Sequence, residues 1–268
     1  MQIDAIVFDL DDTLLNGEAR VSAYTRDVMR RAKEQGVHIV PASGRAIFSM
    51  QPFVEQLAPD NPYIACNGAQ LVNPDHTPME THAFPIEEAK ALIHFFNENG
   101  FYVQCYHGDH IYYSEACDAS RSYMRSSGMY GVALGDLEAR LDFETPKVLS
   151  VQSPERVREM LPIVRERFPN ATVTVSKPYF LEAQPAGVSK GFALKRLAER
   201  MGWSLEHIMA FGDSLNDLSM LEAVGYGVAV GNARDEVKRA VRFVCGANTE
   251  DGVARFVEAH VLKGGREP

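Results

Sequence analysis

Short apolar runs alternate with amphipathic segments over the first 83 residues of the chain. Ala5 to Phe8 is apolar throughout and stops at Asp9, which is typical of a strand buried on both faces of a parallel sheet. Ser22 fits the N-cap of a helix that runs to about Gln35, with Gly36 just past its end. The alternation continues with an expected hairpin at Asn16-Gly17, a strand at 37–40, a helix at 47–57 and a strand at 63–66. Strands that alternate with helices predict βαβ units with right-handed crossovers.

The pattern changes near Phe84, where each helix is followed by two strands. This unit occurs twice, as a helix at 87–99 with strands at 101–106 and 111–113, and as a helix at 154–168 with strands at 171–175 and 179–183. Helices that precede antiparallel strand pairs predict an α+β arrangement, with the helices on one face of a sheet. Residues 116–146, between the two units, are left without assigned elements.

The α/β alternation resumes after Pro185-Ala186-Gly187, which has the composition of a linker. The expected elements are helices at 190–201, 218–223 and 233–240 and strands at 208–211, 227–230 and 241–245. We therefore predict an α/β domain built from residues 1–83 and 187–268, with an α+β domain at 84–186 inserted into it.

The composition narrows the classes of partner. The chain has 268 residues, of which 46% are hydrophobic, and this is enough for two domains with cores of their own. A formal net charge of −9 argues against non-specific binding to nucleic acids or anionic membranes, which requires a basic surface. No apolar run approaches the ~18 residues of a membrane helix, and the N-terminus lacks a signal-peptide pattern.

The four cysteines indicate a reducing compartment. Their spacing matches no zinc site, and a chain of this length needs no disulfide to fold, so reduced thiols are expected. We predict a cytoplasmic protein, and the sequence does not indicate its oligomeric state.

The strongest chemical motif is Asp9-Leu10-Asp11-Asp12-Thr13, directly after the first buried strand. Ligands of open α/β sheets bind at the carboxyl ends of the strands, and two carboxylates two residues apart in such a loop can reach one cation. A few carboxylates together with water and a phosphate are the usual ligands of Mg²⁺. The alternative is an acidic turn before the next helix.

Three further motifs stand at strand ends or helix starts. Ser43-Gly44-Arg45 offers a hydroxyl and backbone amides, which suit an anion, although Ser43 alone fits an ordinary N-cap. Lys190 stands at a helix start, where a cation is unfavourable unless it faces an anion. The segment from Gly212 to Asp217 puts three polar side chains after a core strand. Together the four motifs predict one site at one edge of the sheet.

In their order and spacing the four motifs resemble those of the haloacid dehalogenase superfamily, and specifically its Cof-like phosphatases with a large α+β cap (subclass IIB). The resemblance extends over nearly the whole chain and includes the Asn67-Gly68-Ala69 turn and the late Asp251-Gly252-Val253. It implies a Rossmann-like core, an inserted cap at 84–186 that closes over the substrate and selects it, and a Mg²⁺-dependent phosphatase activity toward a small phosphomonoester.

The resemblance also implies roles for individual residues. Asp9 would be the nucleophile and a metal ligand, and Asp11 the general acid and base, which also offers its backbone carbonyl to Mg²⁺. Asp213 would be the third metal ligand, with Asp217 as its support. The phosphoryl oxygens would be held by Leu10, Ser43, Gly44, Lys190 and Asn216, and Arg45 and Asn67 would contact the substrate or the cap.

Two positions depart from the family pattern. The family commonly has glycine where Asp12 stands and threonine where Ser43 stands. Ser43 keeps the hydroxyl group. Asp12 tolerates a left-handed backbone better than most residues, but its charge would alter the affinity for metal or substrate.

Other functions remain open at the level of the sequence. A phosphomutase would share every motif, and a phospho-accepting receiver module would share the aspartate, magnesium, hydroxyl and lysine but would need neither Asp11 nor the insertion. Sugar phosphates, pyridoxal phosphate, nucleotides and flavin mononucleotide are all candidate substrates. Residues of the inserted domain that could line a pocket, although aromatic side chains in strands more often pack, are Tyr106, His107, Tyr112, Tyr113 and Arg125.

Overall fold

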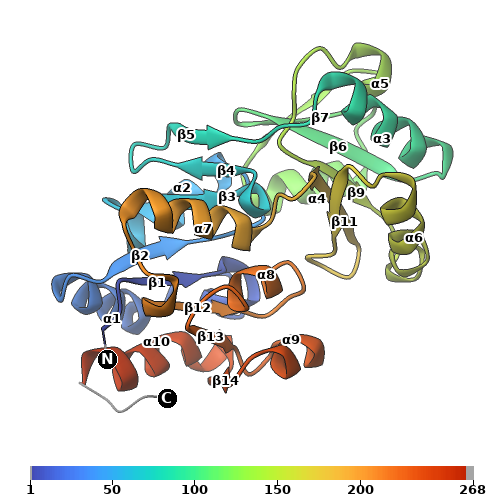
Figure 1. Cartoon of the computed structure of the whole chain (residues 1–268). Coiled ribbons are helices and arrows are strands. Elements are labelled where there is room, and N and C mark those ends of the chain that lie inside the picture. The colour runs from blue at the N-terminus through green and yellow to red at the C-terminus, as the bar shows by residue number, and fades with distance from the viewer. Residues whose placement is uncertain (1, 264–268) are drawn as a thin grey trace.

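The structure of the protein is a computed structural model that describes residues 2–263. The two ends of the chain form one unit, and the middle of the chain forms a second unit beside it (Figure 1). Within residues 2–263, no helix combines the length and the apolar character needed to cross a bilayer.

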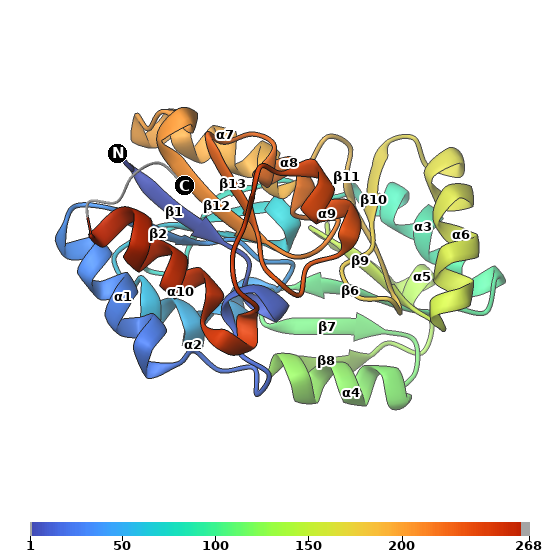
Figure 2. The ribbon, with the colours of Figure 1, turned by 90° about the horizontal axis from the view of Figure 1, so that it is seen from below.

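The first unit, which we call the core, is built on a five-stranded parallel sheet in the order β14-β13-β12-β1-β2. Helices α1 (Ala23–Glu34) and α10 (Gly252–Val257) lie on one face of this sheet, and α7 (Lys190–Met201) and α8 (Leu218–Leu221) lie on the other (Figure 2). The strands are β1 Ala5–Phe8, β2 His38–Pro41, β12 Ile208–Gly212, β13 Tyr226–Ala229 and β14 Phe243–Val244, and the remaining core helices are α2 Ile47–Leu57 and α9 Asp235–Ala240.

The second unit, which we call the cap, contains a six-stranded sheet in the order β10-β11-β9-β6-β7-β8, antiparallel except for the β7–β8 pair. Helices α3 (Ile86–Glu98) and α6 (Pro154–Arg167) cover one face through a buried apolar cluster. The strands are β6 Tyr102–His107, β7 His110–Tyr113, β8 Tyr130–Ala133, β9 Val148–Val151, β10 Ala171–Thr174 and β11 Phe180–Pro185, and the shorter helices are α4 Asp118–Ser127 and α5 Leu137–Arg140.

A small antiparallel sheet follows β1 and β2 along the chain. It consists of β3 (Tyr63–Ala65), β4 (Gln70–Val72) and β5 (Pro78–Thr81). Near it, a separate apolar cluster joins Cys66 and Val188 of the core to Tyr106 and Leu149 of the cap. The uncovered face of the cap sheet is therefore packed toward the core.

The expected fold class is confirmed, with a parallel α/β core and an inserted α+β unit. The largest buried clusters are also separate, because one draws on residues between Ile3 and Val72 and between Ala193 and Val257, and another on residues between Phe84 and Ala183. The boundaries at residues 83/84 and 186/187 themselves stay a prediction.

The hairpin expected at Asn16-Gly17 is wrong. The chain after β1 forms an irregular turn at Leu10–Leu14, with an extended backbone at Asp11 and a left-handed one at Asp12, and no strand flanks the turn at residues 16–20. The side chain of Asn16 accepts hydrogen bonds from the backbone amides of Glu18 and Arg20, both at 3.0 Å, which stabilises a local turn without strand pairing.

Candidate active site

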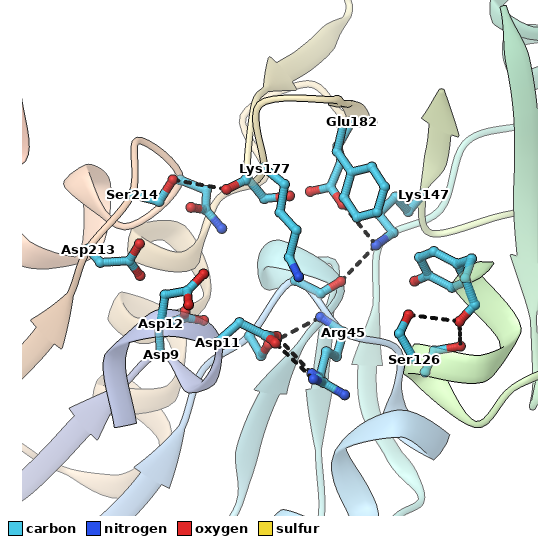
Figure 3. Close-up of a pocket in the computed structure, with 17 residues that line it drawn as sticks. Asp9, Asp11, Asp12, Arg45, Ser126, Lys147, Lys177, Glu182, Asp213 and Ser214 are labelled. Atoms are coloured by element: carbon cyan, nitrogen blue, oxygen red, sulfur yellow. Dashed lines mark hydrogen bonds and ion pairs between the residues drawn. The ribbon is translucent and has the colours of Figure 1, made fainter. Parts of the chain in front are cut away.

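Three neighbouring strands of the core bring the sequence motifs to one edge of the sheet. β1 leads into Asp9, β2 into the loop at 43–45, and β12 into the loop at 213–217. Because β12, β1 and β2 are adjacent and parallel, their carboxyl ends lie side by side. The three loops and the facing cap line a cavity of ≈ 90 Å³ (Figure 3).

Lys190 is fully buried between two carboxylates. Its Nζ donates to Asp9 Oδ1 and to Asp217 Oδ1, each at 2.6 Å. Burial by itself lowers the pKa of the ammonium group, but Asp217 and Asp9 raise it above its ordinary value. The lysine expected to face an anion at the start of α7 therefore faces the proposed nucleophile.

Asp217 is held by both of its oxygens. Oδ1 accepts from Lys190, and Oδ2 accepts from the backbone amides of Asp213 and Ser214, both at 3.0 Å. Gly212 makes this approach possible, because a Cβ there would lie 2.5 Å from the Cβ of Asp217. Asp217 is thus fixed between Lys190 and the backbone at 213–214, and its supporting role stays a prediction.

Asp9, Asp213 and Asp217 form a carboxylate cluster whose ligand atoms all lie within 4.8 Å of one another. Burial, followed by the charge of Asp217, raises the pKa of Asp213 to about 7, and Thr13 Oγ1 donates to its carboxylate at 2.8 Å. Burial also raises the pKa of Asp9 well above its ordinary value, although Lys190 opposes this. Crowded carboxylates with a single ammonium group among them are a donor set that suits a hard divalent cation.

Asp11 lies apart from this cluster, in a bidentate ion pair with Arg45. Arg45 Nε and Nη2 donate to its two carboxylate oxygens at 2.7 and 2.8 Å, and the guanidinium group also lies 5.0 Å from the ring centroid of Phe53. Burial alone raises the pKa of Asp11, but Arg45 holds it below its ordinary value. Asp11 is therefore ionised here, and it must take up a proton before it can donate one.

Asp12 adopts the left-handed conformation that the sequence analysis allowed for it, with φ 60° and ψ 5°. Its backbone oxygen accepts from Asn232 Nδ2 at 2.7 Å, and its side chain lines the cavity. The backbone turn that glycine makes in the family pattern is thus available to aspartate.

Ser43 is not the N-cap of α2, because that helix begins at Ile47 and Ala46 occupies the cap position. The buried hydroxyl group of Ser43 accepts from the backbone amide of Arg45 at 3.2 Å. Ser43 and Gly44 both line the cavity, whereas Leu10 packs its side chain into the core, so its predicted role concerns its backbone amide.

Asn67 and Asn216 lie in contact at the same edge. Asn216 Nδ2 donates to Asn67 Oδ1 at 2.9 Å, and Asn216 Oδ1 is buried without a hydrogen-bond partner among residues 2–263. Asn67 contacts the cap as expected, since its Nδ2 donates to Glu182 at 2.6 Å. Arg45 donates its side-chain hydrogen bonds to Asp11.

The cap wall of the cavity consists mostly of residues that the sequence analysis missed. Of the cap residues considered there, none lines this cavity, and Tyr106 and His107 line a second cavity of ≈ 630 Å³. Tyr123, Ser126 and Ser127 lie at helical spacing in α4, within residues 116–146, where no element was predicted. The residues that do line the cavity from the cap are Tyr123, Ser126, Ser127, Lys147, Ser176, Lys177, Phe180 and Glu182.

The chain is similar to known proteins in both sequence and structure. The sequence pattern of the haloacid dehalogenase-like hydrolases matches residues 6–257. The chain is 31% identical to a pyridoxal phosphate phosphatase of Escherichia coli, over 98% of this chain and 100% of the relative. It is 29% identical to a 5-amino-6-(5-phospho-D-ribitylamino)uracil phosphatase of Bacillus subtilis, over 98% and 97% of the two chains. A crystal structure of a haloacid dehalogenase-like hydrolase from Bacteroides thetaiotaomicron superimposes with a TM-score of 0.86 at 30% identity, covering 96% of this chain and 99% of that one.

Proposed function

Since the chain belongs to the haloacid dehalogenase-like hydrolases and is a phosphatase of that family, we propose that it hydrolyses a small phosphomonoester through a phospho-aspartate on Asp9, with Mg²⁺ as cofactor. The observation that carries this proposal is the position of Asp9. Its carboxylate is held by Lys190 within the cluster of acidic groups. Asp9 lies at the cavity wall, and Asp11 lies two residues further along the same loop (Figure 3).

Asp9 supplies the nucleophile. One carboxylate oxygen attacks the phosphorus atom while the bond from phosphorus to the leaving alkoxide breaks, and Asp11 gives that alkoxide a proton. In the second step Asp11 takes a proton from water, and the resulting hydroxide attacks the phosphorus. Inorganic phosphate leaves and Asp9 is regenerated. Because Arg45 holds Asp11 ionised, we propose that the arriving substrate separates this pair, and that the freed carboxylate takes up a proton from solvent before it donates one to the leaving alkoxide.

Lys190 makes the approach of an anion to Asp9 possible. Phosphoryl transfer spreads negative charge over three equatorial oxygens, and the enzyme must neutralise that charge. The ammonium group of Lys190 offsets the charge of Asp9, and Asp217 fixes its position. Ser43, Gly44, Asn216 and the Leu10 amide would hold the phosphoryl oxygens.

We propose that Asp9, Asp213 and the backbone carbonyl of Asp11 hold the metal ion. Both oxygens of Asp217 are engaged by Lys190 and by backbone amides, which favours an orienting role for it over ligation. When bound, Mg²⁺ supplies positive charge that stabilises the developing charge on the phosphoryl oxygens.

Removal of divalent metal is expected to abolish hydrolysis. Chelation with EDTA should lower kcat/KM by about 10²-fold or more, because the metal contributes several kcal/mol to the transition state. Added Mg²⁺ should restore the rate, whereas Ca²⁺ should not, because it prefers more ligands and longer bonds. Circular dichroism of the chelated protein is the control for folding, and full activity after exhaustive chelation contradicts the prediction.

The substrate class is a small phosphorylated metabolite. The two relatives named above act on pyridoxal phosphate and on a phosphorylated ribitylaminouracil, and sugar phosphates, nucleotides and flavin mononucleotide also fit the chemistry of the site. A screen of these metabolites with Mg²⁺, measuring released phosphate, tests the proposal. Release from none of them contradicts it, and phosphate that moves to a second position of a sugar without release indicates a phosphomutase.

We further propose that the inserted unit, residues 84–186, is the cap that selects the substrate. Its residues form one wall of the cavity, and Lys177 reaches into that space from the loop between β10 and β11 (Figure 3). The protein's cytoplasmic location stays a prediction from its cysteines.

The substitution Phe180→Leu in the cap wall is expected to change the choice of substrate. It reshapes the wall of the cavity without touching Asp9 or Asp11, so the ratio of kcat/KM between two metabolites should shift by about 10-fold. Turnover of p-nitrophenyl phosphate should change little, because this ester needs little help from the cap. The matched control is Ile163→Ala, an exposed apolar residue of α6. Equal losses for all substrates contradict a role of the cap in selection.

A further inference from the structure

Two charged residues of the cap, Lys147 and Glu182, are buried where the cap meets the core. They lie near the loops at 43–45 and 213–217, which we call the phosphate-binding loops because they carry Ser43, Gly44 and Asn216. The exposed fractions of Lys147 and Glu182 are only 1% and 3%. Glu182 lies in β11 and is paired in register with Leu149 of β9, two residues after Lys147. Its neighbours Leu181 and Ala183 point into the apolar cluster beneath α3 and α6, so Glu182 points the other way, toward the core.

Lys147 contacts the loop at 43–45 directly. Its Nζ donates to the backbone oxygen of Gly44 at 2.7 Å and to Glu182 Oε1 at 3.3 Å, and it lies 4.5 Å from the ring centroid of Tyr106. Burial alone lowers the pKa of this ammonium group, but the Glu182 carboxylate holds it above its ordinary value. The cap therefore places a permanent positive charge on a carbonyl group of the loop that would hold the phosphoryl group.

Glu182 is connected to the loop at 213–217 through the side chain of Asn67. Its Oε2 accepts from Asn67 Nδ2 at 2.6 Å, and Asn67 Oδ1 accepts from Asn216 Nδ2 at 2.9 Å. A continuous chain of hydrogen bonds thus runs from the cap sheet to the side-chain amide of Asn216. The amide orientation leaves Asn216 Oδ1 buried and without a partner among the described residues, which ordinary packing does not explain.

The turn that carries Asn67 is in tight contact with the other phosphate-binding elements. A Cβ at Gly44 would lie 2.8 Å from Asn67 Oδ1, and a Cβ at Gly68 would lie 2.1 Å from the backbone oxygen of Ser189, the residue before Lys190. Cys66 and Asn67 both have left-handed backbones, with φ 51° and 55°. Non-glycine residues persist in that region only where their surroundings hold them.

Stability alone does not account for this arrangement. A buried ion pair gains little over apolar residues of similar volume, because both charges lose their hydration. The contacts of Lys147 and Glu182 reach from the cap to loops of the core that line the catalytic site. A role in placing those loops accounts for the charged residues and for their partners.

We propose that Lys147 and Glu182 are positioning residues, which set the two phosphate-binding loops when the cap is closed: Lys147 through the Gly44 carbonyl, and Glu182 through Asn67 to the amide of Asn216. This inference rests on the proposed role of Gly44 and Asn216 in holding the phosphoryl group. Cap closure and phosphate binding then stabilise each other, because the same side chains take part in both.

The test is the affinity for inorganic phosphate, measured by calorimetry in the presence of MgCl₂, together with kcat and KM. In Glu182→Gln an amide replaces one of the two acceptor oxygens, so Lys147 and Asn67 cannot both be satisfied. The dissociation constant for phosphate and KM are expected to rise by about 10- to 100-fold. The matched control is Glu80→Gln, which removes an acidic partner of Arg196 and Arg200 away from the cavity and should leave both constants unchanged.

A paired replacement separates positioning from stability. The double variant Lys147→Met/Glu182→Leu removes both charges and is expected to recover the Tm that the single variant loses. Phosphate affinity should remain low in this double variant. If its Tm and its phosphate affinity both return to those of the unmodified protein, the pair is only structural and the proposal is overturned.

A second variant keeps the test decisive if the double variant does not fold. Asn67→Gly keeps the left-handed backbone while removing the intermediate amide. If Glu182 acts through Asn67, adding Glu182→Gln to Asn67→Gly should cause no further loss of phosphate affinity, whereas additive losses overturn the proposed connection. Failure of the unmodified protein to hydrolyse any phosphomonoester counts against the proposed function instead, and the two failures are therefore distinguishable.

Discussion

Asp9→Asn is expected to abolish hydrolysis of every phosphomonoester. The amide keeps the shape of the side chain but is no nucleophile, and the phospho-aspartate cannot form. The loss in kcat should be on the order of 10⁶-fold, as when the nucleophile of a covalent mechanism is removed. The measurement is phosphate release under saturating substrate, with mass spectrometry of the protein quenched in acid to detect phosphorylation at Asp9.

Asp4→Asn is the matched control for this substitution. Asp4 stands at the opposite end of the same strand, where its carboxylate accepts from the backbone amide of Ser204 at 3.1 Å. The amide oxygen can keep this bond, and activity should stay within a few-fold of the unmodified protein. Detectable turnover with intact Michaelis–Menten behaviour in Asp9→Asn would exclude Asp9 as the nucleophile.

Asp11→Asn is expected to separate the two half-reactions. Asparagine cannot move a proton, so hydrolysis of alkyl phosphates should fall by about 10²–10⁴-fold. With an aryl phosphate the leaving group needs little protonation, and Asp9 should still become phosphorylated. Hydrolysis of that intermediate still needs a base, so the phospho-protein should accumulate and be visible by mass spectrometry.

The Arg45 ion pair adds a control to this experiment, because Asp11→Asn also leaves that guanidinium group without its carboxylate partner. Thermal unfolding of the variant shows whether the fold has suffered. Adding Asp9→Asn to this variant must remove the accumulated phosphorylation, because the Asp9 carboxylate is the group that carries the phosphoryl group. Hydrolysis of alkyl phosphates by Asp11→Asn at the normal rate would rule out the acid and base role, even if Asp9 survived as nucleophile.

The kinetics of the unmodified protein distinguish the alternatives that the motifs left open. A phosphatase turns over rapidly many times and releases phosphate to water. A receiver module would keep a long-lived phospho-aspartate with little net hydrolysis, and a mutase would return the phosphoryl group to the substrate.

The local pattern of apolar and capping residues was enough to predict the strands and helices of the core. Ala5–Phe8 is apolar on both faces because helices cover both sides of the parallel sheet, and the strand is found where it was expected. Ser22 accepts from the backbone amide of Thr25 as an N-cap should, and α7 begins at Lys190. Because parallel strands end at one edge, the motifs that follow them could be assigned to one site before any contact was known.

The elements within residues 116–146 were not predicted from the sequence. Within this segment, β8 (Tyr130–Ala133) is an edge strand with mostly exposed side chains. Outside it, β4 and β5, which were also not predicted, are short strands of a small separate sheet. Such strands are stabilised by pairing with distant segments and leave little alternation in the sequence. The helix that carries Tyr123, Ser126 and Ser127 to the cavity, α4, also lies within residues 116–146 and was not predicted.

Only the tertiary structure decided which charged groups meet. Lys190 contacts Asp9 across 181 positions of the chain, Arg45 contacts Asp11 across 34, and Lys147 lies 103 positions from Gly44. Sequence pattern reflects local backbone preference and burial, whereas these contacts depend on how segments far apart in the chain pack together, within the core for Lys190 and Arg45 and between the cap and the core for Lys147. That is why the sequence by itself placed the four motifs at one edge of the core sheet, while the pairing of Asp11 with Arg45 and the connection from Lys147 and Glu182 to the loops at 43–45 and 213–217 became visible only in three dimensions.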